Sequence, residues 1–264
     1  IIYRLKNRIR KIKMNPKFKI LVINLDSSED RLLSMGNQLA ELGLDFERVA
    51  GVRGSELSEE EKSAVYDRQV NIKKYYKLLN DGEIGCYLSH VRCYEKIVSD
   101  QLDFALILED DAILTPDIVK FIDQIGCLEK NWDYVKLSHG RKQKDIQNTT
   151  VLIDNLAIGN TAKLPSTTTG QFVSLNGASK LIKHALPVAR PIDIDIQYWF
   201  EKELKCLVVR PFPVLNGDFG SEINVVEDRR LTQKSRWRRI LQKVNYEWNL
   251  FRHRNKIPSI PNKR

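Results

Sequence analysis

The sequence predicts an α/β fold with a mostly parallel sheet and helices on both of its faces. Short apolar runs with the length of buried strands alternate with longer stretches of helical periodicity through most of the chain. Several of the runs are followed by residues that commonly begin helices. With 264 residues, the chain is long enough for one large domain with a well-buried core.

The first predicted elements follow one another closely along the chain. Residues 19–25 form the first buried strand, and a helix that Gly43 ends separates it from a second strand at residues 46–50. Ser58 and Glu61 have the spacing of a capping box, so they predict the start of another helix. The two strands and the helix between them form a strand–helix–strand unit at the start of the domain.

The same alternation continues to about residue 210. A helix is expected at 84–99, and an apolar strand with an acidic end follows it. Thr115 and Pro116 predict a helix that runs to about Leu128. Residues 138–150 are polar and predict a loop over a site. The remaining predictions are strands at 134–137, 151–153, 169–174 and 206–210, and a helix at 177–186.

The charge is distributed very unevenly. The first 19 residues carry +8 and the last 36 carry +11, so the middle carries −10 in a chain whose net charge is +9. An acidic core between two basic ends argues against a nucleic-acid-binding core, which would carry positive charge itself. We therefore expect no nucleic-acid partner.

The four cysteines show neither zinc-site spacing nor a disulfide framework, which indicates a reduced, cytosolic protein. No apolar run approaches 18 residues, so no transmembrane helix is expected. The charged N-terminal residues have no apolar segment of the kind that a signal peptide requires.

The most informative feature is the run of three carboxylates, Glu109, Asp110 and Asp111, directly after the apolar strand at residues 104–108. The carboxyl edge of a parallel sheet is where ligands bind in open α/β folds. Side-chain alternation would turn Glu109 and Asp111 to the same side. A hard divalent cation that bridges a phosphorylated substrate would neutralise these charges, whereas the alternative is an acidic strand end kept in solvent.

Three further stretches carry residues suited to chemistry. Residues 82–90 combine two glycines with Ser89 and His90 at a helix start, where an anion could bind, or they form an ordinary glycine turn. Residues 167–171 could contact sugar hydroxyls or simply favour a strand. Asp193 and Asp195 are flanked by apolar residues, so either could be a general base, or one could cap a helix.

Both basic ends have apolar residues at helical spacing. At the C-terminus Trp237, Leu241, Val244 and Trp248 form a stripe that lysine and arginine residues flank. This is typical of a helix that lies in an anionic membrane interface. The alternatives are packing on the protein's own core, or binding to calmodulin-like partners or nucleic acid.

Taken in order, the motifs of the central region resemble glycosyltransferase family 25, the lipooligosaccharide galactosyltransferases of Gram-negative bacteria. The resemblance covers about residues 18–220. Its pieces are residues 22–25 with Arg31 downstream, 82–90, 108–112, 169–178 and 191–193.

The resemblance implies a GT-A-type, Rossmann-like catalytic domain, which we place at residues 18–228, between a basic segment at 1–17 and a basic membrane-association segment at 229–264. It implies a UDP-sugar donor, most often UDP-galactose, and Mn²⁺ or Mg²⁺ held by Asp111 with Glu109. Asp193 would be the base of an inverting transfer, with Asp195 second. The implied donor-side and substrate-side residues are Asn24, Leu25, Arg31, Ser89, His90, Glu109, Asp110, Thr169 and Gly170.

The charge distribution agrees with a lipooligosaccharide acceptor. Such an acceptor grows on the cytoplasmic face of the bacterial inner membrane, where basic ends would hold the acidic core. Two other functions compete with this one: a metal-dependent nucleotidyltransferase, and a non-catalytic membrane-surface or nucleic-acid-binding protein. The sequence has no Walker-type loop, which weakens the nucleotidyltransferase, and a non-catalytic protein would leave the three carboxylates unexplained.

Overall fold

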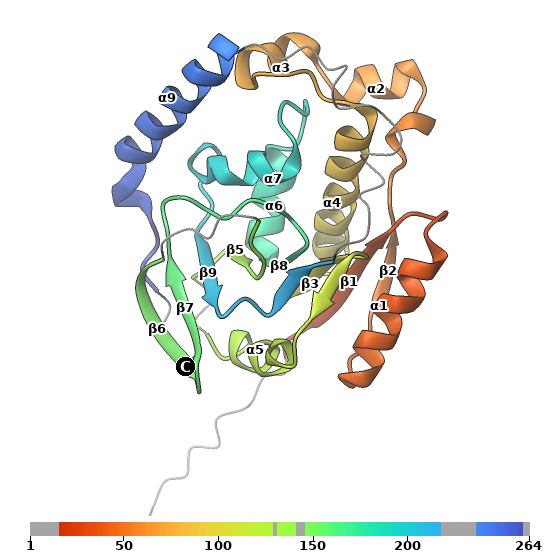
Figure 1. Ribbon diagram of the computed structural model, residues 1–264, viewed down its shortest axis with the longest axis vertical. Coiled ribbons are helices and arrows are strands. Elements are labelled where there is room, and N and C mark those ends of the chain that lie inside the picture. Colours follow the sequence, from red (N-terminus) through yellow and green to blue (C-terminus); the bar gives the residue numbers. More distant parts are fainter. Residues whose placement is uncertain (1–15, 129–130, 141–145, 218–235, 261–264) are drawn as a thin grey trace, which may run out of the picture.

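The computed structural model describes residues 16–128, 131–140, 146–217 and 236–260 (Figure 1). Its centre is an eight-stranded sheet in the order β2-β1-β3-β8-β5-β9-β7-β6. Strands β8 and β7 run antiparallel to both of their neighbours, so the other six share one direction and the predicted mostly parallel sheet is confirmed. The strands are β1 Phe18–Asn24, β2 Glu47–Ala50, β3 Phe104–Glu109, β5 Tyr134–Lys136, β6 Gln147–Ile153, β7 Leu156–Asn160, β8 Gly170–Ser174 and β9 Cys206–Arg210.

Helices cover both faces of the sheet, as predicted (Figure 1). One apolar core lies under α1 and α5 and contains Met35, Leu39 and Phe121. The other lies under α4, α6 and α7 and contains Tyr94, Ile97 and other large side chains. The helices are α1 Glu29–Glu41, α2 Glu59–Val65, α3 Arg68–Lys74, α4 Asp81–Ser99, α5 Asp117–Ile125, α6 Leu175–Lys183, α7 Ile192–Asp195 and α9 Arg236–His253, with short 3₁₀ helices at Gly54–Glu56, Ile196–Glu201 and Arg254–Lys256.

Two capping boxes determine where helices of the first half begin. The predicted one is confirmed, because the Ser58 side chain accepts a hydrogen bond from the Glu61 backbone and the Glu61 carboxylate accepts one from the Ser58 backbone. A second, between Asn80 and Glu83, starts α4 three residues before the predicted start. The glycines of residues 82–90 therefore lie inside the helix rather than in a turn.

The acidic residues lie in a tight turn that a second, two-stranded sheet holds in place. Strand β3 ends at Glu109, and β4 (Ala112–Leu114) follows two residues later and pairs with β10 (Val214–Asn216). The alternation expected of Glu109 and Asp111 stops at the end of β3, so it does not determine the direction of Asp111. Neither strand of this small sheet was predicted from the sequence.

Other boundaries differ from the prediction in the middle of the chain. The polar stretch at 138–150 is not all loop, because residues from Gln147 onward belong to β6, which pairs with β7 as a hairpin. Helix α5 ends at Ile125, and Pro116 rather than Thr115 occupies its cap position. Pairing with β7 sets the extent of β6, and the Thr115 hydroxyl donates to the Pro213 carbonyl at 3.3 Å instead of capping α5.

The predicted C-terminal helix is present as α9, which lies along the edge of the molecule beside α3 (Figure 1). It docks through Leu250, which is buried, and through Arg238, which donates a hydrogen bond to the carbonyl of Ile72 at 2.7 Å. The predicted N-terminal amphipathic segment lies outside the described residues except for its last two. Within the described part of the chain, no helix is both long and apolar enough to cross a membrane.

Candidate active site

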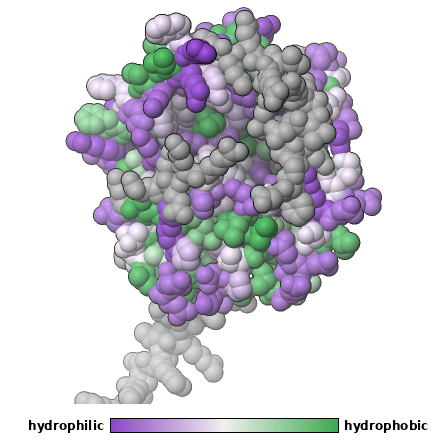
Figure 2. Space-filling view, in the orientation of Figure 1, coloured by the Kyte–Doolittle hydropathy of each residue, from purple (hydrophilic) through white to green (hydrophobic). Residues whose placement is uncertain are grey.

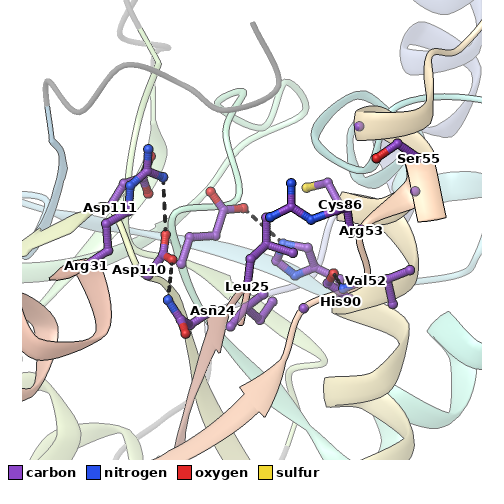
Figure 3. A pocket seen from close by; sticks show the side chains of 16 residues that line it. Asn24, Leu25, Arg31, Val52, Arg53, Ser55, Cys86, His90, Asp110 and Asp111 are labelled. Atoms are coloured by element: carbon purple, nitrogen blue, oxygen red, sulfur yellow. Dashed lines mark hydrogen bonds and ion pairs between the residues drawn. The ribbon is translucent and has the colours of Figure 1, made fainter. Parts of the chain in front are cut away.

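A pocket opens at the carboxyl ends of β1 and β3, where it is also lined by α4 and by the loop after β2 (Figure 3). This is the edge at which the sequence placed a ligand. Eight residues predicted from the sequence line the pocket: Asn24, Leu25, Arg31, Ser89, His90, Glu109, Asp110 and Asp111.

Asp110 is held on the side of the pocket nearest to α1. The Asn24 side-chain amide donates to Asp110 Oδ2 at 2.8 Å, and Arg31 lies 3.6 Å from Oδ1 (Figure 3). Asn24 is itself buried, and its amide oxygen accepts a hydrogen bond from Arg48 at 3.0 Å. The Asn24 amide therefore occupies one oxygen of this carboxylate and the Arg31 charge offsets its charge, which leaves Asp110 poorly suited to bind a cation.

Glu109 is held on the side of α4 instead. His90 Nε2 lies 3.0 Å from Glu109 Oε1, and the Thr168 hydroxyl donates to the same oxygen at 2.6 Å. Burial acts to raise the pKa of Glu109, but these hydrogen bonds outweigh it and hold the pKa below the usual range. Glu109 is therefore a carboxylate with one oxygen engaged by the protein.

Asp111 is the unusual member of the three. Its Oδ1 is buried and has no hydrogen-bond partner within the described residues. Burial and the negative charges of Glu109 and Asp110 raise its pKa to about 7. An unsatisfied buried carboxylate oxygen beside a second carboxylate fits a hard cation such as Mn²⁺ or Mg²⁺, which Asp111 and Glu109 would hold.

Cys86, His90 and Glu109 form a second possible donor set, because one ligand atom from each lies within 4.8 Å of the others. Burial raises the pKa of the Cys86 thiol well above its ordinary value. The thiolate is the form that binds metals. This set therefore fits Mn²⁺ or Mg²⁺ less well than the oxygen atoms around Asp111 do.

The loop at residues 51–55 lines the pocket and was missed in the sequence. It lies directly against α4, since a Cβ placed on Gly85 would be 2.3 Å from the Val52 carbonyl oxygen. Ser89 completes this contact: its hydroxyl accepts from the Val52 backbone at 2.8 Å and donates to the Gly85 carbonyl at 2.7 Å. Ser89 thus positions the loop. The signal available in the sequence was the glycine pair Gly51 and Gly54 after a strand parallel to β1.

Thr169 and Gly170 do not line this pocket. The Thr169 hydroxyl donates to Asn216 at 2.7 Å, which ties β8 to β10, and Gly170 packs closely on Val214. Thr168 is the threonine that contacts the acidic turn, through Glu109. The hydroxyl-rich stretch therefore holds Glu109 and the two sheets in place rather than lining the pocket.

Asp193 and Asp195 lie on α7, outside the lining of the pocket. Asp195 is buried and bound to three groups: Tyr87 at 2.8 Å, Lys202 at 2.9 Å and Arg190 at 3.2 Å. Although burial acts in the opposite direction, these partners lower its pKa. Burial raises the pKa of Asp193, against the positive charge of Lys136, which lowers it.

An acidic turn at the carboxyl edge of a parallel sheet, beside an open pocket, is typical of proteins that bind phosphorylated ligands. The family model described as "Glycosyltransferase family 25 (LPS biosynthesis protein)" matches residues 17–196. The chain belongs to glycosyltransferase family 25.

Known relatives also match a large part of the chain. A "Glycosyltransferase 25 family member" of Aedes aegypti is 30% identical over 187 residues, and human "Procollagen galactosyltransferase 2" is 27% identical over 184 residues. Both matches cover 67% of this chain, which spans 29% of the length of each of these relatives.

Two solved structures are more distant. One is a glycosyltransferase involved in glycosylation of the major capsid of PBCV-1, with 14% identity, 70% of this chain and 67% of that chain covered, and a TM-score of 0.32. The other is A197 from STIV, with 10% identity, coverage of 73% and 81%, and a TM-score of 0.35. Similarity at this level supports no conclusion about the site.

Proposed function

We propose that this protein transfers a hexose, most readily galactose, from a UDP-sugar to a hydroxyl of a lipooligosaccharide, with inversion at the anomeric carbon. The observation that carries the proposal is the acidic turn with its unsatisfied Asp111 oxygen, which lines the same pocket as Asn24 and Leu25. Family membership supports glycosyl transfer, and the names of the relatives support galactose as the sugar.

Each side of the pocket has a separate task in this proposal. Asn24, Leu25 and the loop at residues 51–55 receive the nucleotide, and Arg31 faces the acidic turn as a fixed positive charge. Asp111 and Glu109 hold Mn²⁺ or Mg²⁺, which when bound offsets the charge of the departing diphosphate. The closely packed loop keeps the nucleotide side rigid, which favours a fixed orientation of the sugar.

Asp193 is the better candidate for the base that takes the proton of the attacking hydroxyl. Burial raises its pKa, which strengthens a carboxylate as a base, while the positive charge of Lys136 acts in the opposite direction. Asp195 is committed to ion pairs with Lys202 and Arg190, so a structural role suits it better. The sequence alone left this choice open.

Helix α9 supports an acceptor at a membrane surface. Most of its apolar side chains are exposed, by between 53% for Ile240 and 77% for Trp237. Figure 2 shows apolar side chains beside hydrophilic ones along the edge where Figure 1 places α9. Residues 236–260 carry seven cations against one acid, Glu247, so pairing with a second copy would bring like charges together. An anionic lipid surface complements both the stripe and the charge.

From these features we propose a peripheral protein on the cytoplasmic face of the bacterial inner membrane. Replacing Leu241 and Trp248 together with glutamate should weaken binding to vesicles that contain anionic lipid by at least tenfold, because each buried side chain contributes about 1.5–3 kcal/mol. Leu33→Glu is the matched control, since Leu33 is 65% exposed on α1. Equal sedimentation of the paired variant and the control with the vesicles would contradict the proposal.

The transfer reaction can be tested directly with the complete chain. The assay would measure UDP release from UDP-galactose, UDP-glucose and UDP-N-acetylglucosamine, with truncated lipooligosaccharide or a collagen peptide as acceptor. We expect release with UDP-galactose and the lipooligosaccharide, and a β-linked product by nuclear magnetic resonance. Release only with the collagen peptide would contradict the acceptor, and an α-linked product would contradict inversion.

A further inference from the structure

A chain of buried hydrogen bonds runs from β5 through β8 to α4 and ends at the acidic turn. Gln171 is fully buried on β8. Its amide oxygen accepts a hydrogen bond from the Tyr134 hydroxyl at 3.1 Å, and its amide nitrogen lies 3.3 Å from His90 Nδ1. His90 is also fully buried, and its other nitrogen contacts Glu109 at 3.0 Å.

The Glu109 carboxylate and a neutral His90 ring together set the direction of these hydrogen bonds, since the Tyr134 hydroxyl can either donate or accept and so sets none. An ionised carboxylate can only accept, so His90 Nε2 must carry the proton that it shares with Glu109. A neutral imidazole then has a bare Nδ1, which requires a donor, and the Gln171 amide nitrogen is that donor. The amide oxygen is thereby left for Tyr134, whose hydroxyl donates.

This arrangement holds Oε1 of Glu109 by hydrogen bonds and does not engage Oε2. Oε1 receives hydrogen bonds from both His90 and Thr168. No hydrogen bond to Oε2 is present in the described part of the chain, and Glu109 lines the pocket. A carboxylate held by one oxygen presents the second in a defined direction.

We propose that Gln171, oriented by Tyr134, is a positioning residue that holds His90 as the Nε2–H tautomer and so keeps Glu109 turned toward the donor pocket. The role of Glu109 in donor binding rests on the proposed function, whereas the tautomer does not. With its proton on Nε2, His90 has no lone pair for a cation on that side. His90 and Glu109 are therefore joined by a hydrogen bond rather than by a shared cation, and a bound cation would be held by Asp111 and Glu109.

Nuclear magnetic resonance of the histidine ring nitrogens tests the tautomer without any nucleotide. The chain has four histidines, so a protein labelled with ¹⁵N in histidine gives few ring signals, and the His90→Gln variant identifies those of His90. We expect a protonated Nε2 and a bare Nδ1, unchanged when Zn²⁺ is added. A bare Nε2, a doubly protonated ring or a zinc-shifted Nε2 signal would overturn the assignment.

Gln171→Glu tests whether the Gln171 amide determines the tautomer of His90, because a carboxylate at this position can only accept from Nδ1–H. We expect Nδ1 to become protonated and the affinity for UDP in the presence of Mn²⁺ to fall by about tenfold. Tyr134→Phe, which keeps the ring in the core, should lower the affinity less. Asn71→Leu is the control, since it removes another buried amide, one that donates to the Ala189 carbonyl at 2.8 Å.

The outcomes separate this inference from the proposed function. A folded Gln171→Glu protein with the wild-type tautomer and wild-type UDP affinity would overturn the positioning role. The expected tautomer in a wild-type protein that binds no UDP would contradict the proposed function, and with it the task given to Glu109.

Discussion

The contact between Gly85 of α4 and the loop at residues 51–55 makes a quantitative prediction. In Gly85→Ala the new Cβ would lie 2.3 Å from the Val52 carbonyl oxygen and 2.6 Å from the Gly54 backbone nitrogen. Because non-bonded atoms are most stable at about 3.5–4.0 Å, the loop must retreat by roughly 1 Å. Overpacking of this kind costs about 1–3 kcal/mol, and the gain of alanine over glycine within a helix offsets about 1 kcal/mol of it.

The net cost is then up to about 2 kcal/mol, so we expect Gly85→Ala to lower the midpoint of thermal unfolding by up to about 8 °C. The displaced loop lines the pocket, so UDP affinity measured by calorimetry should fall by about tenfold, which corresponds to about 1.4 kcal/mol. Gly36→Ala is the matched control, because its Cβ would meet only the Phe46 ring, at 3.5 Å. If the two variants melt and bind UDP alike, the close contact does not hold the loop in place.

The remaining predictions concern the two aspartates of α7 and the buried Lys136. Asp193→Asn should lower kcat by about 10²–10⁴-fold with UDP affinity unchanged, and a kcat within fivefold of wild type would exclude it as the base. Asp195→Asn should instead lower the free energy of unfolding by about 3–5 kcal/mol, because it removes the carboxylate that pairs with the buried Lys202 and one of the two that bind Arg190; urea unfolding measures this. Burial lowers the pKa of Lys136 from 10.5 to about 8, so between these values the unfolded chain binds a proton that the folded chain does not. Folding should therefore become more favourable by about 3 kcal/mol as the pH rises through that window, and Lys136→Met should lose this rise.

The elements that carry the site were predictable because their sequences are strongly patterned. The apolar runs that became β1 and β3 end in Asn24 and in Glu109, and parallel strands bring their carboxyl ends to one edge. The position of His90 on a helix was predictable because helical periodicity identifies α4 over most of its length. The exposed stripe of α9 was also predictable, because its apolar residues recur at helical spacing.

The features that were missed depend on contacts between distant residues. Which threonine meets Glu109 follows from the antiparallel register of β3 and β8, in which Leu108 is opposite Gly170, and composition contains no information on register. The loop at residues 51–55 joins the pocket because two backbones touch at Gly85. The choice between Asp193 and Asp195 depends on Lys202 and Arg190, whose positions only the fold defines.

The most direct test of the central claim is calorimetric titration of UDP into the wild-type protein and Asp111→Asn, with and without Mn²⁺. If Asp111 completes a cation-dependent nucleotide site, wild type should bind UDP only weakly without Mn²⁺ and at least tenfold more tightly with it. Asp111→Asn should bind weakly in both conditions. Equal affinity of both proteins whether or not Mn²⁺ is present would contradict the account of the acidic turn.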